Sequence, residues 1–150
     1  MIAKDSGGNH TPVPAGTYPA RCCAVIDLGT QTMTFSGEQK SRRTIRIAWE
    51  LSGPKAADGK PMMIGRMYGL TLHVKSSLRK DLQAWRGRPF TEAELKGFEV
   101  KNILDKPCMI SVVHETKGTE VHDNVAAVMA LPAGMSAPAL TTPPVYFSTD

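Results

Sequence analysis

Apolar and polar residues alternate most regularly over residues 43–51, and this alternation predicts a strand with one buried face. The apolar face would carry Ile45, Ile47, Trp49 and Leu51, and the mixed face Thr44, Arg46, Ala48 and Glu50. Four further segments are compatible with strands because they are rich in apolar and β-branched residues and are bounded by glycine, proline or polar turns. These segments are residues 18–27, 62–73, 107–114 and 121–131.

A helical period replaces the alternation between the third and fourth expected strands. Ser76 or Ser77 can cap a helix that begins at Leu78, and Leu78, Leu82 and Trp85 then share one helical face. Gly87 would end this helix. Residues 91–94 form a capping-box pattern, which predicts a second short helix to about residue 97.

The order of three strands, a helix and two strands is that of the OB-fold, a five-stranded Greek-key barrel in the all-β class. Such barrels bind ligands on the face of their second and third strands and through the loops after the first and fourth. The long polar stretch 28–41 and the hairpin at 115–120 match those loops. We therefore expect a domain over residues 16–131, a flexible arm over 1–15 and a disordered, proline-rich tail over 132–150.

The charge of the chain is concentrated in one stretch. Residues 40–88 hold twelve of the eighteen lysines and arginines but only three of the fourteen acids, so this stretch is about +9 while the whole chain is +4. Trp49, Tyr68 and Trp85 are interleaved with these cations. Cations and aromatic rings along a sheet face favour single-stranded nucleic acid as the ligand.

Several function classes find no support in the sequence. The three cysteines form no CxxC pair, which favours reduced thiols in a cytoplasm. The chain has no signal-peptide pattern near its start and no apolar run of the ~20 residues that span a bilayer. Phosphate-loop, GxSxG and HExxH motifs are absent, so we expect no enzyme activity and no cofactor. A turn at Lys117-Gly118 would place His114 and His122 on opposite faces, which disfavours a shared metal.

The first candidate binding residues are Lys40, Arg42, Arg43 and Arg46, because only Glu50 follows them closely as a compensating acid. Arg46 lies opposite the apolar stripe and is expected to point outward, where a phosphate backbone would run. The alternative is a solvated, charged strand edge.

The aromatic candidates are Phe35, in an otherwise polar loop, and Tyr68, which we pair with Arg66. Simple alternation puts Arg66 and Tyr68 on the same face as two leucines, so an outward position for them requires a bulge at Gly69. Trp49 and Trp85 are expected in the core.

A second basic set lies on and before the main helix, and within it Lys75 and Arg79 are candidates for extending the electropositive track. The other members are Lys80, Arg86 and Arg88. A solvated helix face is the alternative interpretation.

Four segments resemble a group of small phage and prophage proteins over roughly residues 15–131: AGTYPA at 15–20, LHVKSSLRKDL at 72–82, WRGRPF at 85–90 and KNILDKPC at 101–108. Members of that group are thought to be OB-fold single-stranded DNA-binding proteins of phage replication or recombination modules. The resemblance implies the same role here, in the host cytoplasm, without identifying binding residues.

The predicted function is therefore non-catalytic, sequence-tolerant binding of single-stranded DNA. The alternatives are an OB module that binds proteins, as a replication scaffold or an inhibitor of a host factor, and an RNA-binding OB domain. The short footprint of one barrel favours dimers or cooperative arrays, and the sequence leaves the oligomeric state open. Tyr146, Phe147 and Asp150 loosely resemble the aromatic-acidic tips with which bacterial single-strand binding proteins recruit replication or recombination partners.

Overall fold

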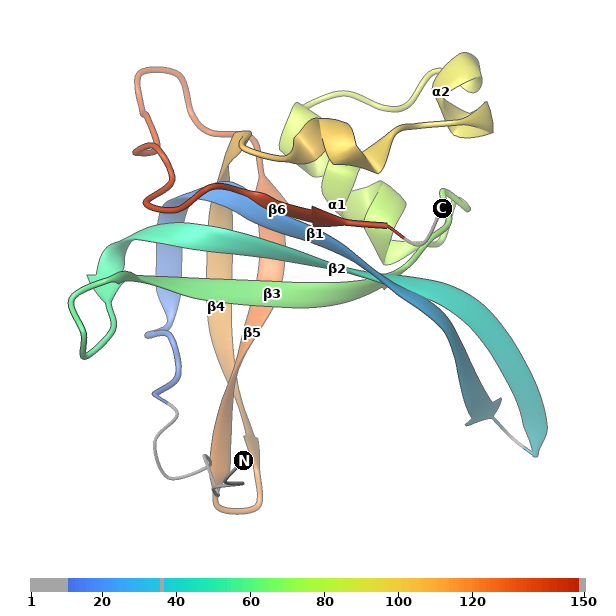
Figure 1. Cartoon of the computed structure of the whole chain (residues 1–150), viewed down its shortest axis with the longest axis horizontal. Helices are drawn as coiled ribbons and strands as arrows, with labels where there is room; N and C mark the ends of the chain where they lie inside the picture. Colours follow the sequence, from blue (N-terminus) through green and yellow to red (C-terminus); the bar gives the residue numbers. More distant parts are fainter. Residues whose placement is uncertain (1–10, 36, 149–150) are drawn as a thin grey trace.

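The computed structural model describes residues 11–35 and 37–148, except for the side chains of residues 31, 33–35, 39 and 40. Most of the described chain is antiparallel β-sheet, with two α-helices between the third and fourth strands, which confirms the expected all-β class (Figure 1). The elements are β1 (Gly16–Phe35), β2 (Glu38–Lys55), β3 (Pro61–Gly69), α1 (Ser77–Arg86), α2 (Glu92–Lys96), the 3₁₀ helix η2 (Val100–Ile103), β4 (Pro107–Lys117), β5 (Glu120–Met129) and β6 (Val145–Phe147).

The strands form one curved sheet with the order β3-β2-β1-β4-β5. β1 pairs with β2 along most of its length and with β4 through residues 16–21. No hydrogen-bonded ladder joins β3 to β5 among the described residues, so the sheet is not closed there. β6 pairs in parallel with residues 24–26 of β1, along the edge of β1 that β4 leaves uncovered.

β1 and β2 are longer than predicted. Residues 28–35 and 38–41, which lie in the expected loop 28–41, continue both strands as a paired ribbon that projects from the sheet (Figure 1). Thr30, Thr32 and Thr34 recur at every second position, and β-branched residues at this spacing favour a strand over a loop. The ribbon of β4 and β5 also projects, and its turn lies at residues 118–119, one residue later than expected.

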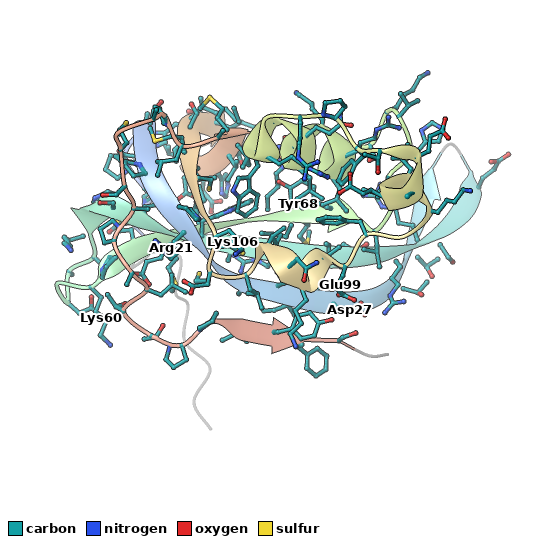
Figure 2. The ribbon with its side chains drawn as sticks, turned by 90° about the horizontal axis from the view of Figure 1, so that it is seen from above. Arg21, Asp27, Lys60, Tyr68, Glu99 and Lys106 are labelled. Carbon is teal, nitrogen blue, oxygen red and sulfur yellow. The ribbon has the colours of Figure 1, made fainter. Side chains whose placement is uncertain are left out.

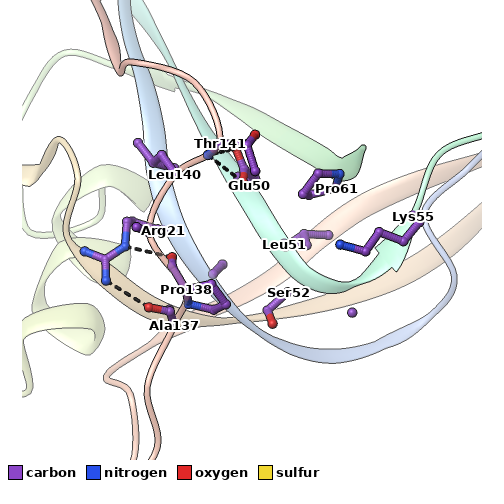
Figure 3. Close-up of a pocket in the computed structure, with 13 residues that line it drawn as sticks. Arg21, Glu50, Leu51, Ser52, Lys55, Pro61, Ala137, Pro138, Leu140 and Thr141 are labelled. Atoms are coloured by element: carbon purple, nitrogen blue, oxygen red, sulfur yellow. Dashed lines mark hydrogen bonds between the residues drawn. The ribbon is translucent and has the colours of Figure 1, made fainter. Parts of the chain in front are cut away.

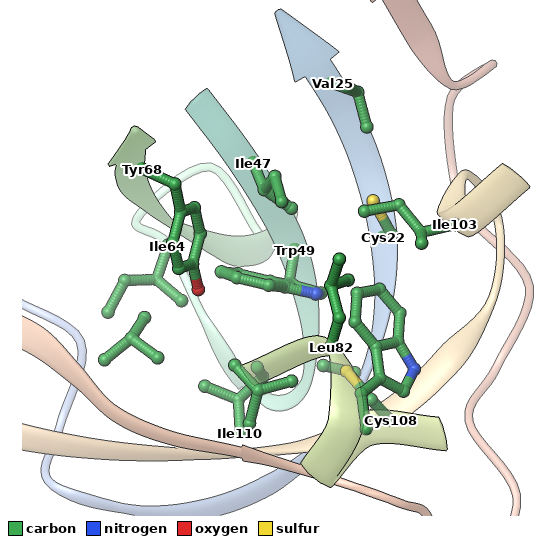
Figure 4. Close-up of a cluster of buried hydrophobic side chains, with 14 of the residues drawn as sticks. Cys22, Val25, Ile47, Trp49, Ile64, Tyr68, Leu82, Ile103, Cys108 and Ile110 are labelled. Carbon is green, nitrogen blue, oxygen red and sulfur yellow. The ribbon is translucent and has the colours of Figure 1, made fainter. Parts of the chain in front are cut away.

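The core lies on the inner face of the sheet, beneath α1. The apolar stripe of β2 packs there with Trp85, and the centroids of the Trp49 and Trp85 rings are 6.0 Å apart. Cys22 and Cys108 lie in the same cluster, and burial raises the pKa of Cys22 to about 12 (Figure 4). The thiols are thus buried and free.

Both helices begin and end within one residue of the predicted positions. The Ser76 side chain accepts a hydrogen bond from the backbone N–H of Arg79, and Gly87 ends α1 with a left-handed φ of 72°. α2 has the expected capping box, in which Thr91 and Glu94 bond reciprocally. None of the helices in the described part of the chain is long and apolar enough to cross a membrane.

Of the flexible arm predicted over residues 1–15, residues 11–15 are described, and Val13 among them is almost fully buried. Its N–H donates to Asp123 Oδ2 at 2.8 Å, and its carbonyl lies 2.7 Å from His114 Nε2. His114 and Asp123 are directly paired across β4 and β5, so the ribbon holds this residue from two strands. His122 pairs with Glu115 and so lies on the other face of the ribbon, as expected.

The tail also differs from its predicted disorder, since its residues 145–147 form β6 on the edge of β1. The Arg21 guanidinium donates to the carbonyls of Ala137 and Pro138, and Glu50 accepts from Thr141 (Figure 3). Composition alone predicted disorder because the tail has few apolar residues. The free edge of β1 provides partners for its backbone, which composition does not reveal.

Candidate nucleic-acid interface

The antiparallel register of β2 and β3 sorts their side chains onto two faces. Ile45, Ile47 and Trp49 pair with Tyr68, Arg66 and Ile64, so all six occupy the inner face. The other face, which we call the outer face, is formed by Arg42, Thr44, Arg46, Ala48 and Glu50 of β2 and by Met63, Gly65, Met67 and Gly69 of β3.

Two exposed arginines lie flat on the outer face because glycines leave room for them. A Cβ added to Gly65 would lie 2.5 Å from Cζ and Nη2 of Arg46, and one added to Gly69 would lie 3.2 Å from Cδ, Nε and Cζ of Arg42. No carboxylate of the described residues lies within ion-pair distance of either guanidinium. Their donors therefore remain available to an anionic ligand, and their role in binding stays a prediction.

Exposed methionines flank these arginines. Met63 and Met67 are 61% and 63% exposed, although both are large apolar residues. They alternate with Ile64 and Arg66 along β3, so they lie on the outer face. Sequence reasoning missed them because it looked for aromatic rings. The signal was present in the alternation of β3, since an inward Ile64 requires an outward Met63.

Tyr68 is not available for stacking. Its side chain is 1% exposed and lies on the inner face beside Ile64, within the core cluster (Figures 2 and 4). The Tyr68 hydroxyl donates to Asp81 Oδ2 at 2.6 Å, and burial raises its pKa well above the usual value, with the Asp81 hydrogen bond as the next cause. The prediction of an outward Tyr68 is therefore wrong, because β3 has no bulge at Gly69 and α1 provides a buried partner.

Arg66 and Arg43 also form ion pairs with acids on the inner side of the sheet. Arg66 Nη1 lies 3.0 Å from Asp81 Oδ2, and the Arg66 guanidinium lies 5.3 Å from the Tyr68 ring centroid. Arg43 pairs with the buried Asp27 of β1. The expectation that only Glu50 could compensate Arg43 overlooked Asp27, which is distant in the sequence but adjacent in the sheet.

The remaining predicted residues are not brought together with the outer face. Lys75 is exposed in the connection before α1. Arg79 donates to Gln83 Oε1 at 3.3 Å and to the carbonyl of Leu72 at 3.4 Å, so its guanidinium helps to join α1 to that connection. The side chains of Phe35 and Lys40 lie outside what the structure describes, and their candidacy stays a prediction.

The tail bounds the outer face on the side of β1. Leu140 packs on a small apolar cluster of Cys23, Ala24 and Ala48. Burial raises the pKa of the Cys23 thiol to about 11, and the charge of Glu50 raises it further. The face left open to a ligand is therefore the strip of β2 and β3 that carries Arg42, Arg46 and the two methionines.

Comparison with known proteins does not assign the chain to a family. No protein-family model matches the chain, and no curated protein is significantly similar to it. In the described part of the chain, no three histidine, cysteine or acidic side chains gather as a metal site would require.

Proposed function

We propose that the protein is a non-catalytic, sequence-tolerant single-stranded DNA-binding protein built on an OB-fold. The strand order β3-β2-β1-β4-β5, with helices between β3 and β4, supports this fold, since OB barrels are five-stranded and partly open. A role in phage DNA replication or recombination follows from the sequence resemblance.

The observation that carries the proposal is the pair of exposed arginines on the outer face. Arg42 and Arg46 lie four residues apart on one strand, so their Cα atoms are separated by roughly 13 Å. A single strand lying along β2 would present phosphates of its backbone to both guanidiniums. Neutralising each phosphate releases counterions, which drives binding without reading sequence.

Met63 and Met67 would supply contacts to the bases. Their thioether side chains are flexible and polarizable, and sulfur packs favourably against aromatic rings. Flexible apolar contacts adapt to all four bases, as a sequence-tolerant protein requires. The mechanism thus combines electrostatic contact with the backbone on β2 and apolar contact with bases on β3.

A protein-binding module is the second candidate, and the pairing of β6 with β1 favours it. The edge of β1 at residues 24–26 accepts an extended strand. A partner peptide can bind such an edge through main-chain hydrogen bonds. In this alternative the outer face would carry no nucleic acid.

Fluorescence anisotropy with labelled oligo-dT, oligo-rU and duplex DNA at low salt separates these candidates. We expect dT to bind with a Kd of about 1 μM or lower, and duplex DNA to bind more weakly. Tighter binding of rU than of dT would favour the RNA-binding alternative. Failure of all three probes to bind would reject the proposal and leave the protein-binding module.

A further inference from the structure

A second basic site lies at the helical end of the molecule, away from the outer face. A hollow of about 430 Å³ opens between the end of α1, the segment joining α2 to η2, and the start of β4. Trp85 and Phe98 contribute aromatic surface to its lining, and Arg86, Arg88 and Lys106 contribute cations. Flat apolar walls with a few charged groups are typical of small-molecule sites.

Cations outnumber carboxylates among the residues that line this hollow. Glu94 is the one carboxylate in the lining, and Arg86 Nη2 binds it at 2.7 Å. The hydrogen bond from the Thr91 backbone and the one from Arg86 lower the pKa of Glu94 to about 2, so it stays ionised and bound. The Arg86 guanidinium also lies over the Phe90 ring in a cation–π contact, with 4.7 Å between the Arg86 Cζ and the ring centroid.

Two cations of the lining are left without such a partner. Arg88 and Lys106 are exposed, and no described carboxylate lies within ion-pair distance of either. Arg86 Nη1 is buried and has no hydrogen-bond partner among the described residues. The lining therefore has a net positive charge and spare donors beside aromatic surface.

We propose that this hollow binds a nucleotide, with the base against Trp85 and Phe98 and the phosphate at Arg88 and Lys106. An aromatic ring joined to a phosphate matches both the apolar walls and the unpaired cations. This site goes beyond the proposed function, because it uses no residue of the outer face. Its ligand is a free nucleotide or the phosphorylated end of a strand, since both present the same chemistry.

Intrinsic fluorescence reports on the site, because Trp85 is one of the two tryptophans and lines the hollow. We expect dAMP to change the fluorescence saturably, with a Kd of about 1 mM or lower. Deoxyadenosine, which lacks the phosphate, should bind at least tenfold more weakly. The variant Arg88→Ala/Lys106→Ala should weaken dAMP binding at least tenfold, and circular dichroism should show that its fold is kept.

Two comparisons separate the ligand sources and the two sites. A 5′-phosphorylated dT oligomer that binds more tightly than its 5′-hydroxyl form, with the difference lost in Arg88→Ala/Lys106→Ala, assigns the site to strand ends. Equal binding of the two oligomers, with dAMP still bound, assigns it to free nucleotides. Arg42→Ala/Arg46→Ala should leave dAMP binding unchanged even where it abolishes binding of dT. Absence of saturable dAMP binding, or dAMP binding that ignores Arg88 and Lys106, would overturn the proposal.

Discussion

The two faces of the β2–β3 pair use the same residue type in opposite ways. On the inner face, Arg43 and Arg66 bind the buried carboxylates of Asp27 and Asp81. On the outer face, Arg42 and Arg46 lie over glycines and meet no described carboxylate. A cluster of cations in a sequence is therefore not one site. Those paired with buried acids maintain the fold, and those left unpaired are available to a ligand.

Replacing Asp81 with alanine should have the largest effect on the inner face. It leaves the Tyr68 hydroxyl and Arg66 without their shared acceptor. We expect the free energy of unfolding to fall by about 2–3 kcal/mol, at the low end for a broken buried pair because Arg66 is partly exposed. Urea denaturation measures this loss. The folded variant should bind oligo-dT as the parent does, and weaker binding would place the inner network at the interface.

Replacing Met63 and Met67 together with alanine tests the apolar half of the outer face. Both side chains are exposed, so stability should change by no more than about 0.5 kcal/mol. Affinity for oligo-dT should fall about fivefold, which corresponds to roughly 1 kcal/mol. The salt dependence should stay the same, because apolar contacts release few ions. Unchanged affinity would mean that the bases do not reach β3.

Deleting residues 135–150 tests whether the tail covers the outer face beside β1. Removal of Leu140 should expose Cys23, whereas Cys22 and Cys108 remain in the main core. Labelling with a thiol reagent at pH 8, followed by mass spectrometry, should therefore modify Cys23 first. The two core cysteines serve as internal controls. Equal protection of all three thiols would show that the tail is not what buries Cys23.

Replacing Gly65 with alanine is the mildest change to the outer face. The new Cβ would overlap the Arg46 guanidinium, which has to move while its charge is kept. We expect a two- to threefold loss of affinity for oligo-dT, a few tenths of a kcal/mol, without a loss of stability, because Gly→Ala in an extended strand restricts the unfolded chain. Gly69→Ala is the matched control, since its Cβ would approach Arg42 less closely. A larger loss in Gly69→Ala would contradict this ranking.

Local sequence patterns predicted the two helices and the central parts of the five main strands, but not the extensions of β1 and β2, strand β6 or the partners of the charged residues. The alternation of β2 and the caps at Ser76 and Thr91 depend on near neighbours, so they could be predicted from the sequence. The burial of Tyr68 could not, because Asp81 reaches it only when α1 packs over β3. The pairing of Arg43 likewise depends on the register between β1 and β2. The exposure of Met63 and Met67 could have been predicted from the sequence, since it follows from the alternation of inward and outward residues along β3.

The most direct test of the account is the salt dependence of oligo-dT binding by Arg42→Ala/Arg46→Ala. We expect affinity at low salt to fall more than tenfold, and the slope of log K against log[salt] to flatten by about 1.4, or about 0.7 for each lost phosphate contact. Lys80→Ala/Lys96→Ala, which removes two exposed cations from the helices, should keep the parental slope. If the arginine variant keeps the parental affinity and slope, the outer face does not bind the phosphate backbone.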